Sequence, residues 1–205
     1  MSQKYETYYG LPADVCFCKR CVMSNQRPAS TAEFKHTKDS KKVTLAMDAE
    51  GVCDACRTAE AKESIDYGKR EEQLLQLLDK HRSKDGSYDC IVPGSGGKDS
   101  VFQAHVLKYK YGMNPLTVTW PPILYTDYGY ENWKNWIDIG GFDNLSFRRN
   151  GRVMKLLTKL SIENLLHPFQ PFIMGQKTFV SKMAARFNIP LIFYGEMPGE
   201  YGEKV

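Results

Sequence analysis

Short apolar runs alternate with longer amphipathic stretches in the second half of the chain. The runs lie at residues 88–93, 115–120, 144–147 and 189–194. Between them, apolar residues recur at the three- and four-residue intervals of α-helices, over residues 100–111, 131–139, 152–166 and 175–187. Strands that alternate with helices predict a parallel sheet, because parallel strands need crossover connections. We therefore expect an α/β fold from residue 88 onward.

The first half of the chain has a different pattern. Residues 1–60 hold five of the six cysteines, many charged residues and little apolar periodicity. Residues 61–86 carry leucines at helical spacing, and the polar sequence SKDGS closes the predicted helix. The contrast divides the chain into a cysteine-rich segment at 1–60, a linker helix at 61–87 and an α/β domain at 88–205.

Composition and charge narrow the class of protein. The chain has 205 residues and a formal charge of +4, without the concentrated Lys/Arg surplus of nucleic-acid-binding proteins. No run approaches the roughly 20 apolar residues that span a bilayer. The polar start MSQKYETYYG lacks the build of a signal peptide. We expect a cytoplasmic protein with neither nucleic acid nor membrane as partner.

In a reducing compartment, closely spaced cysteines are metal ligands more often than disulfides. Cys18 and Cys21 form one C-x-x-C pair, and Cys53 and Cys56 form a second. Two such pairs supply the four thiolates of a zinc-ribbon-like site, and we predict structural Zn²⁺ rather than a redox dithiol or unligated thiols. Cys16 is an alternative ligand in place of Cys18.

The sequence IVPGSGGKDSVFQAH at 91–105 follows the first predicted strand with a glycine-rich turn and a helix. Glycines let backbone amides approach an anion, and a helix start directs free N–H groups and a positive dipole end at the same place. A plain strand-to-helix turn explains the glycines but not the lysine, aspartate and serine that follow. We therefore predict a phosphate-binding loop with these residues: Gly94, Ser95, Gly96, Gly97, Lys98, Asp99 and Ser100. Asp99 is the predicted Mg²⁺ ligand.

The loop is not a Walker A motif, since Asp99 follows the lysine and Val92 stands where the first glycine belongs. The string SGGKDS instead resembles the signature of the PP-loop ATP pyrophosphatases. The resemblance implies a Rossmann-like domain of the adenine nucleotide alpha hydrolase type. It also implies that the loop holds the pyrophosphate end of ATP while a substrate oxygen attacks the α-phosphate.

Several further stretches narrow the resemblance. CKRCVMSNQRP, GVCDAC, VTWPPILYTDYGYENW, LLTKLSIENLLHPFQPFIMGQK and IFYGEMPGEYG are similar to segments of the N-acetyl sugar amidotransferases. These enzymes serve lipopolysaccharide biosynthesis and flagellin modification, including nonulosonic acids, and convert an acetamido group to an acetamidino group. The resemblance implies adenylation of the amide oxygen, attack by ammonia, and release of AMP and pyrophosphate. It implies ammonia from a separate glutaminase through a channel protein, both similar to the histidine-biosynthesis synthase subunits.

Candidate site residues follow from the loop and from the ends of the predicted strands. We expect catalytic roles for Lys98, Asp99 and Glu196, although Glu196 could equally be a solvated loop carboxylate. Thr119 and Trp120, after the second strand, are expected near the base or ribose of ATP. The predicted substrate contacts are Asp127, Asn132, Gln176, Lys177 and Glu200. Trp133 and Trp136 are expected in the core.

Two alternative functions stay open. A tRNA-thiolating PP-loop enzyme would need cysteines after the loop, and the sequence has none beyond Cys90, which we expect to be a buried small residue. A zinc-ribbon module that binds nucleotide without turnover is the other. Members of the amidotransferase family are longer than this chain. The resemblance therefore implies an incomplete sheet with an open edge, and a chain with little or no activity alone.

Overall fold

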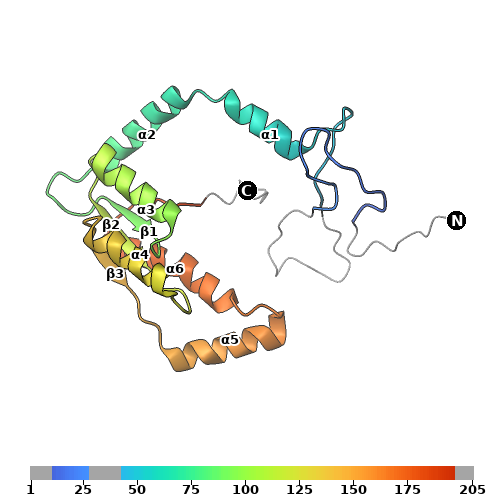
Figure 1. Cartoon of the computed structure of the whole chain (residues 1–205). Coiled ribbons are helices and arrows are strands. Elements are labelled where there is room, and N and C mark those ends of the chain that lie inside the picture. Colours follow the sequence, from blue (N-terminus) through green and yellow to red (C-terminus); the bar gives the residue numbers. More distant parts are fainter. Residues whose placement is uncertain (1–10, 28–42, 197–205) are drawn as a thin grey trace. The chain divides into compact units, whose positions relative to one another are not determined.

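The computed structural model describes residues 11–27 and 43–196 of the 205-residue chain (Figure 1). The chain divides into two compact units. Among the described residues, one unit takes in 11–27 and 43–69, and the other runs from Arg70 to Glu196. The first is cysteine-rich and the second has mixed α/β structure.

Two tight loops and a helix form the cysteine-rich unit. Each loop is closed by an isolated antiparallel bridge, Phe17 to Ser24 in the first and Met47 to Cys53 in the second. The backbone N–H of Lys19 donates to the carbonyl of Gly51 at 3.0 Å and joins the two loops. Helix α1 (Asp54–Glu63) begins directly after Cys53.

The prediction of one continuous helix over 61–86 is wrong. Helix α1 ends at Glu63, and helix α2 (Tyr67–His81) begins after a short break. Asp66 accepts a hydrogen bond from the N–H of Lys69 at 3.0 Å, so its carboxylate caps a new helix instead of continuing the old one. Beyond His81, Arg82 turns away to donate to the carbonyls of Tyr111 and Gly112 at 2.8 Å each.

Three parallel strands form the sheet, in the order β1 (Cys90–Pro93), β2 (Pro115–Thr119) and β3 (Asn144–Ser146). They confirm three of the four predicted strands. The fourth, predicted at 189–194, is reduced to one parallel bridge between Ile192 and Ile91, flanked by two backbone hydrogen bonds of 2.9 Å. Among the described residues, no strand pairs with residues 189–194 on the side away from β1. The only ladder of this segment in the described part of the chain is therefore the short one with β1.

The four predicted helices of this unit are present with shifted boundaries. The first is α3 (Lys98–His105), which continues as a π-helical turn, η3 (Val106–Lys110). The others are α4 (Asp127–Asp138), α5 (Gly151–Leu165) and α6 (Gln170–Phe187). Helix α4 starts earlier than expected because Thr126 caps it, accepting from the N–H of Gly129 at 3.0 Å. Pro171 stands in the first turn of α6, where its missing N–H costs no helical bond.

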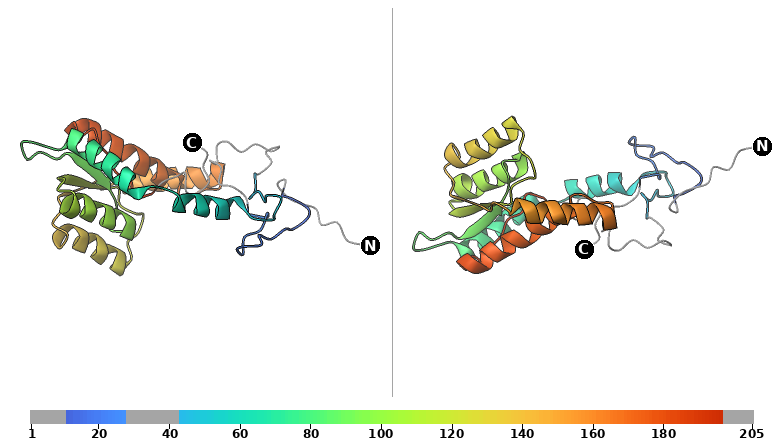
Figure 2. Two further views of the ribbon diagram at one scale, coloured as in Figure 1. Left: turned by 90° about the horizontal axis from the view of Figure 1, so that it is seen from above. Right: turned by 90° about the horizontal axis from the view of Figure 1, so that it is seen from below.

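The sheet is buried on both faces, as a parallel sheet requires. Cys90 and Val92 of β1 belong to a core cluster with Ala104 of α3 and Trp136 of α4. The other face packs against α6, and its cluster contains Ile91, Leu116, Val118, Phe179, Val180 and Ile189. Figure 2 shows α3 and α4 on one side of the sheet and α6 on the other. Cys90 and Trp136 are buried as predicted.

Helix α5 keeps a row of apolar side chains exposed, formed by Val153, Leu156, Leu157 and Leu160. The row follows the spacing of one helix face. Neither α5 nor any other helix in the described part of the chain combines the length and apolarity that crossing a membrane requires.

Candidate functional site

The glycine loop joins the carboxyl end of β1 to the start of α3. Its first residue still belongs to the sheet, because the N–H of Gly94 donates to the carbonyl of Val118 at 3.0 Å. Gly97 precedes the first helical residue with an extended backbone (φ −72°, ψ 153°), and no side chain caps the helix. The helix start is therefore available to an external acceptor.

The surroundings require two of the three glycines in the loop, each for a different reason. A Cβ at Gly94 would lie 2.4 Å from Oγ of Ser100 and 2.8 Å from the ring of Trp136. Gly96 has φ +88°, and its Cβ would lie 2.5 Å from the backbone nitrogen of Trp133. At Gly97 neither applies: the backbone suits any residue and no atom lies within 4 Å. Packing therefore explains Gly94 and Gly96. It does not explain Gly97, whose surroundings at the helix start are open.

The residues after the glycines lie at the first turn of α3. Lys98 Nζ and Asp99 Oδ1 are 2.9 Å apart, and the two side chains are 90% and 53% exposed. Ser100 is buried and its hydroxyl donates to the carbonyl of Gly97 at 3.0 Å. Ser100 thus holds the loop closed, while Lys98 and Asp99 present their charges outside it.

The chain order of the strands reverses at β1. One side of β1 pairs with β2 and the other pairs with residues 191–193. Ligands of open α/β sheets bind at such a switch point, beyond the carboxyl ends of the strands. Gly195 lies there, since its Cβ would be 3.2 Å from the backbone of Asp99 and from the nitrogen of Ser100. The exposed Glu196 follows it.

The two residues expected near the nucleoside are already packed. Thr119 is fully buried, and its hydroxyl accepts from Nε1 of Trp133 at 3.1 Å and from Nδ2 of Asn144 at 2.9 Å. Trp120 stacks on Phe147, with 5.4 Å between centroids. A Cβ at Gly175 of α6 would lie 2.1 Å from the same indole. Both residues lie at the predicted edge of the sheet. The hydroxyl of Thr119 is already hydrogen-bonded within the protein, and the ring of Trp120 is already packed against other residues.

The predicted substrate residues are spread over two helices. Asn132 lies beside the loop, because its backbone carbon would be 3.0 Å from a Cβ at Gly96. Asp127 is exposed in the first turn of α4, and Gln176 and Lys177 are exposed on α6. No hydrogen bond or ion pair within 11–27 and 43–196 joins these three to the loop. Glu200 lies outside the described residues.

Sequence reasoning missed the walls of the loop. Trp133 and Trp136 were expected only as core residues, yet they contact the positions of Gly96 and Gly94. The three-residue spacing of the tryptophans indicates one helix face, but nothing in the sequence connects that face with a loop more than thirty positions earlier. Gly195, in contrast, was expected at this edge of the sheet after the fourth predicted strand, and it lies against Asp99 and Ser100.

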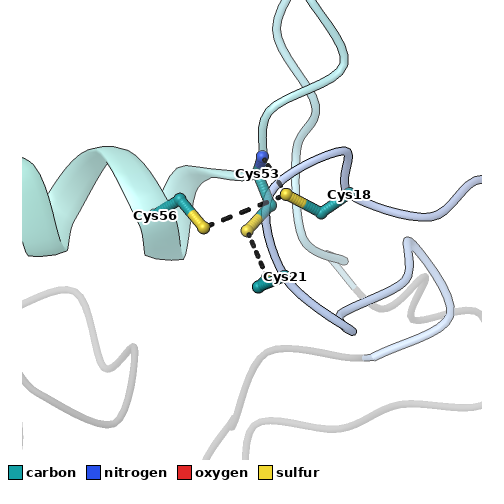
Figure 3. A group of neighbouring side chains, drawn as sticks. All are labelled: Cys18, Cys21, Cys53 and Cys56. Atoms are coloured by element: carbon teal, nitrogen blue, oxygen red, sulfur yellow. Dashed lines mark hydrogen bonds between the residues drawn. The ribbon is translucent and has the colours of Figure 1, made fainter.

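The four predicted cysteine ligands come together in the first unit, with all sulfur atoms within 4.8 Å of one another (Figure 3). The Sγ atoms of Cys21 and Cys53 are 3.6 Å apart, and those of Cys18 and Cys56 are 3.9 Å apart. Tetrahedral zinc with bonds of about 2.3 Å places its sulfur ligands at about this separation. Cys16 is exposed and outside the group, so the choice between Cys16 and Cys18 falls on Cys18.

Backbone donors and crowding give the thiols unequal acidity. The N–H groups of Cys53 and Arg20 each donate to Cys18 Sγ at 3.3 Å and lower the pKa of that thiol from 9.0 to about 6. The pKa of the Cys56 thiol is raised to about 12 by the hydrogen bond between Cys56 and Cys21 and by burial. Cys18 is therefore the more readily ionised of the two thiols, and Cys56 is the one whose ionisation more strongly needs a nearby cation. The group could therefore hold a thiophilic metal ion.

No known protein family profile matches this chain. An uncharacterized protein of Methanocaldococcus jannaschii is 34% identical over 83 residues, which is 40% of this chain. The chain spans 29% of the length of that relative. The similarity extends to a protein without a described activity and leaves the function to be argued from the site.

Proposed function

We propose that the chain is a PP-loop ATP pyrophosphatase of the N-acetyl sugar amidotransferase type, with an adenine nucleotide alpha hydrolase-like domain. Its reaction is the ATP-dependent replacement of the oxygen of a bacterial surface sugar's N-acetyl group by nitrogen from ammonia. The observation that carries the proposal is the loop at 94–100. It combines an uncapped helix start, an open glycine and an exposed Lys-Asp pair at the switch point of a parallel sheet.

Each loop residue has a role that its position supports. The uncapped N–H groups at the start of α3 and the ammonium of Lys98 would bind phosphate oxygens of ATP. Asp99 and Glu196 offer carboxylates close to the same helix start and would hold Mg²⁺, which supplies charge neutralisation at the phosphates. Ser100 holds the loop shape, because its hydroxyl donates to the carbonyl of Gly97.

The chemistry requires two displacements. The amide oxygen attacks the α-phosphorus of ATP, the bond to the β-phosphate oxygen breaks, and pyrophosphate leaves. Ammonia then adds to the amide carbon, a proton is lost, and AMP departs with the former amide oxygen to leave the acetamidino group. The chain's contribution is to position the reactants and to stabilise developing negative charge.

The ammonia would come from a partner glutaminase and reach the site through a channel subunit. A resident glutaminase needs a nucleophilic cysteine, and the chain offers poor candidates. Cys90 is fully buried, and burial raises the pKa of its thiol. Four other cysteines lie in the sulfur cluster, and among the described residues no hydrogen bond joins the thiol of the exposed Cys16 to a base.

We assign structural Zn²⁺ to that cluster. Four thiolates close the coordination sphere and leave no position for substrate, so the ion would stabilise the unit and not act on the sugar. Cys18, Cys21, Cys53 and Cys56 would hold it.

The products of ATP turnover test the proposal. The protein is incubated with Mg²⁺, ammonium chloride, ATP and a panel of N-acetylated sugars and sugar nucleotides, and phosphorus NMR identifies the products. AMP and pyrophosphate are expected, with a mass change in one sugar that corresponds to O replaced by NH.

The Lys98→Ala variant is the control for the role of the loop. It removes one exposed positive charge and leaves the buried core unchanged. ADP and phosphate as products would contradict the proposal. Sulfur transfer to tRNA would favour the thiolation alternative, and ATP binding without turnover by any form of the protein would favour a non-catalytic module.

A further inference from the structure

Arg149 lies in the segment between β3 and α5 with its guanidinium between two aromatic rings. Its Cζ is 5.4 Å from the centroid of Trp120 and 5.5 Å from that of Phe172. One end of the guanidinium is bonded, since Nη2 donates to the carbonyl of Pro122 at 2.7 Å. Arginine placed in this way is rigid and oriented.

The charge of Arg149 has no carboxylate to balance it. Across residues 11–27 and 43–196, no acidic side chain forms an ion pair with Arg149, and its Nη1 is enclosed without a hydrogen-bond partner. Burial lowers the pKa of the Arg149 guanidinium. A charged side chain with an enclosed N–H group that lacks an acceptor destabilises the fold. The presence of such a group at Arg149 therefore points to an acceptor from outside the chain.

A second unpartnered group belongs to the same place. The hydroxyl of Tyr125 is enclosed without a partner, and burial raises the pKa of Tyr125, which keeps it a donor. Arg149 donates to the carbonyl of Pro122, three residues before Tyr125, and so lies beside the segment that carries this hydroxyl. The indole Nε1 of Trp120 also lacks an acceptor but faces Gly175. Two donors, one of them cationic, without any acceptor define a site for an anion.

The pair lies at the edge of the sheet that carries the glycine loop. The ring of Tyr125 packs on Trp133, with 6.3 Å between centroids, and the backbone of Trp133 adjoins Gly96. One aromatic residue, Trp133, therefore separates Tyr125 from the loop.

We propose that Arg149 and Tyr125 form a subsite for an anionic group of the acceptor sugar, a carboxylate or a phosphate. The inference rests on the proposed function, because it takes the glycine loop as the place of ATP. A planar guanidinium suits the two oxygens of either anion. Since Nη1 is enclosed, the anion reaches it only when neighbouring side chains shift.

Calorimetry on the full chain tests the subsite with four probes. They are N-acetylneuraminic acid for the carboxylate, UDP-N-acetylglucosamine for the phosphate, N-acetylglucosamine as the neutral sugar, and ATP with Mg²⁺. The wild type should bind one anionic sugar at least about tenfold more tightly than the neutral one. Arg149→Ala should weaken that probe about 10- to 100-fold, while Arg148→Ala, a neighbouring exposed arginine, should not. ATP affinity should stay the same in both.

The outcomes separate the subsite from the proposed function. No preference of the wild type for either anionic sugar, or full retention of that preference in Arg149→Ala, overturns the subsite. So does a parallel loss of ATP affinity in Arg149→Ala, since the anion would then be a phosphate of ATP. Absence of ATP binding by the wild type refutes the proposed function instead.

Thermal unfolding distinguishes binding from a structural role. Arg149→Met should unfold at the same or a higher temperature than the wild type, because it removes an unbalanced charge from between two rings. A clearly lower unfolding temperature would mark Arg149 as a structural residue and contradict the proposal. Should Arg149→Ala fail to fold, Arg149→Lys keeps the charge and loses the planar fork, and it should weaken the anionic sugar in the same direction.

Discussion

The two units of this protein are stabilised in different ways. Among the described residues of the cysteine-rich unit, the buried apolar cluster consists of Cys18, Val52 and Cys53, two of which are candidate metal ligands. In the α/β unit, two apolar clusters cover both faces of the sheet. So small a core cannot offset the entropy of ordering its unit, whereas the larger clusters can. The comparison predicts that the cysteine-rich unit folds only with a bound metal ion, whereas the α/β unit folds without one.

The largest expected effect is metal removal. Chelation, or Cys53→Ser, should unfold the cysteine-rich unit, since zinc contributes on the order of 10 kcal/mol to small domains of this kind. The α/β unit should stay folded. Metal analysis and amide NMR spectra check both statements. Cys16→Ser is the matched control, because Cys16 is exposed and outside the cluster. Unfolding of both units together, or of neither, would contradict the comparison.

A core truncation should act on the other unit alone. Ile91 of β1 is fully buried, and Ile91→Ala should lower the free energy of unfolding of the α/β unit by about 2–5 kcal/mol. Urea unfolding measures the change, and metal content should remain that of the wild type. Ile123→Ala, at an exposed position, should cost less than about 0.5 kcal/mol. Loss of metal in the Ile91 variant would show that the units are coupled.

Two neighbouring glycines sharpen the account of the loop. Gly96→Ala should cost about 1–3 kcal/mol, because it combines a positive φ with a backbone clash against Trp133. Gly97→Ala should cost less than about 1 kcal/mol, since its surroundings are open. Thermal unfolding of the two variants gives the comparison. Equal destabilisation would mean that Gly97 also has a packing role and would weaken the case for ligand approach.

The smallest expected effect is the pH dependence of folding of the cysteine unit at limiting zinc concentration. Hydrogen bonds from the N–H groups of Cys53 and Arg20 lower the pKa of Cys18 from 9.0 to about 6. Because the folded pKa is the lower one, ionisation of Cys18 favours the folded unit fully above pH 9.0, and this contribution is lost as the pH falls through about 6. At a fixed low zinc concentration, the folded fraction seen in amide NMR spectra should decrease as the pH falls through about 6. A folded fraction that stays constant through that pH range would contradict the prediction.

The two units also differ in how far sequence could predict them. The group of metal ligands could be predicted because each C-x-x-C pair is a short local pattern typical of metal-binding cysteines. The choice of Cys18 over Cys16 could not, because it depends on N–H groups from residues as distant as Cys53. In the α/β unit, apolar runs predicted three strands, but the break at Asp66 depends on one side-chain cap that competes with helical periodicity.

The site shows the same limit. The glycine loop is a continuous motif and was found directly. Its walls, Trp133 and Trp136, and the unbalanced Arg149 are defined by contacts between segments far apart in sequence. An arginine without a carboxylate partner has no signature in sequence, since only the fold shows which partners are missing.

Titration of the 205-residue chain with ATP and Mg²⁺ in a calorimeter tests the central claim most directly, because the claim is that the turn at 94–100 binds the phosphates of ATP. The account predicts one ATP bound per chain, with affinity reduced at least about tenfold in Lys98→Ala, the loss of one charged phosphate contact. Absence of ATP binding by the folded wild-type chain, or equal affinity in the variant, would contradict it.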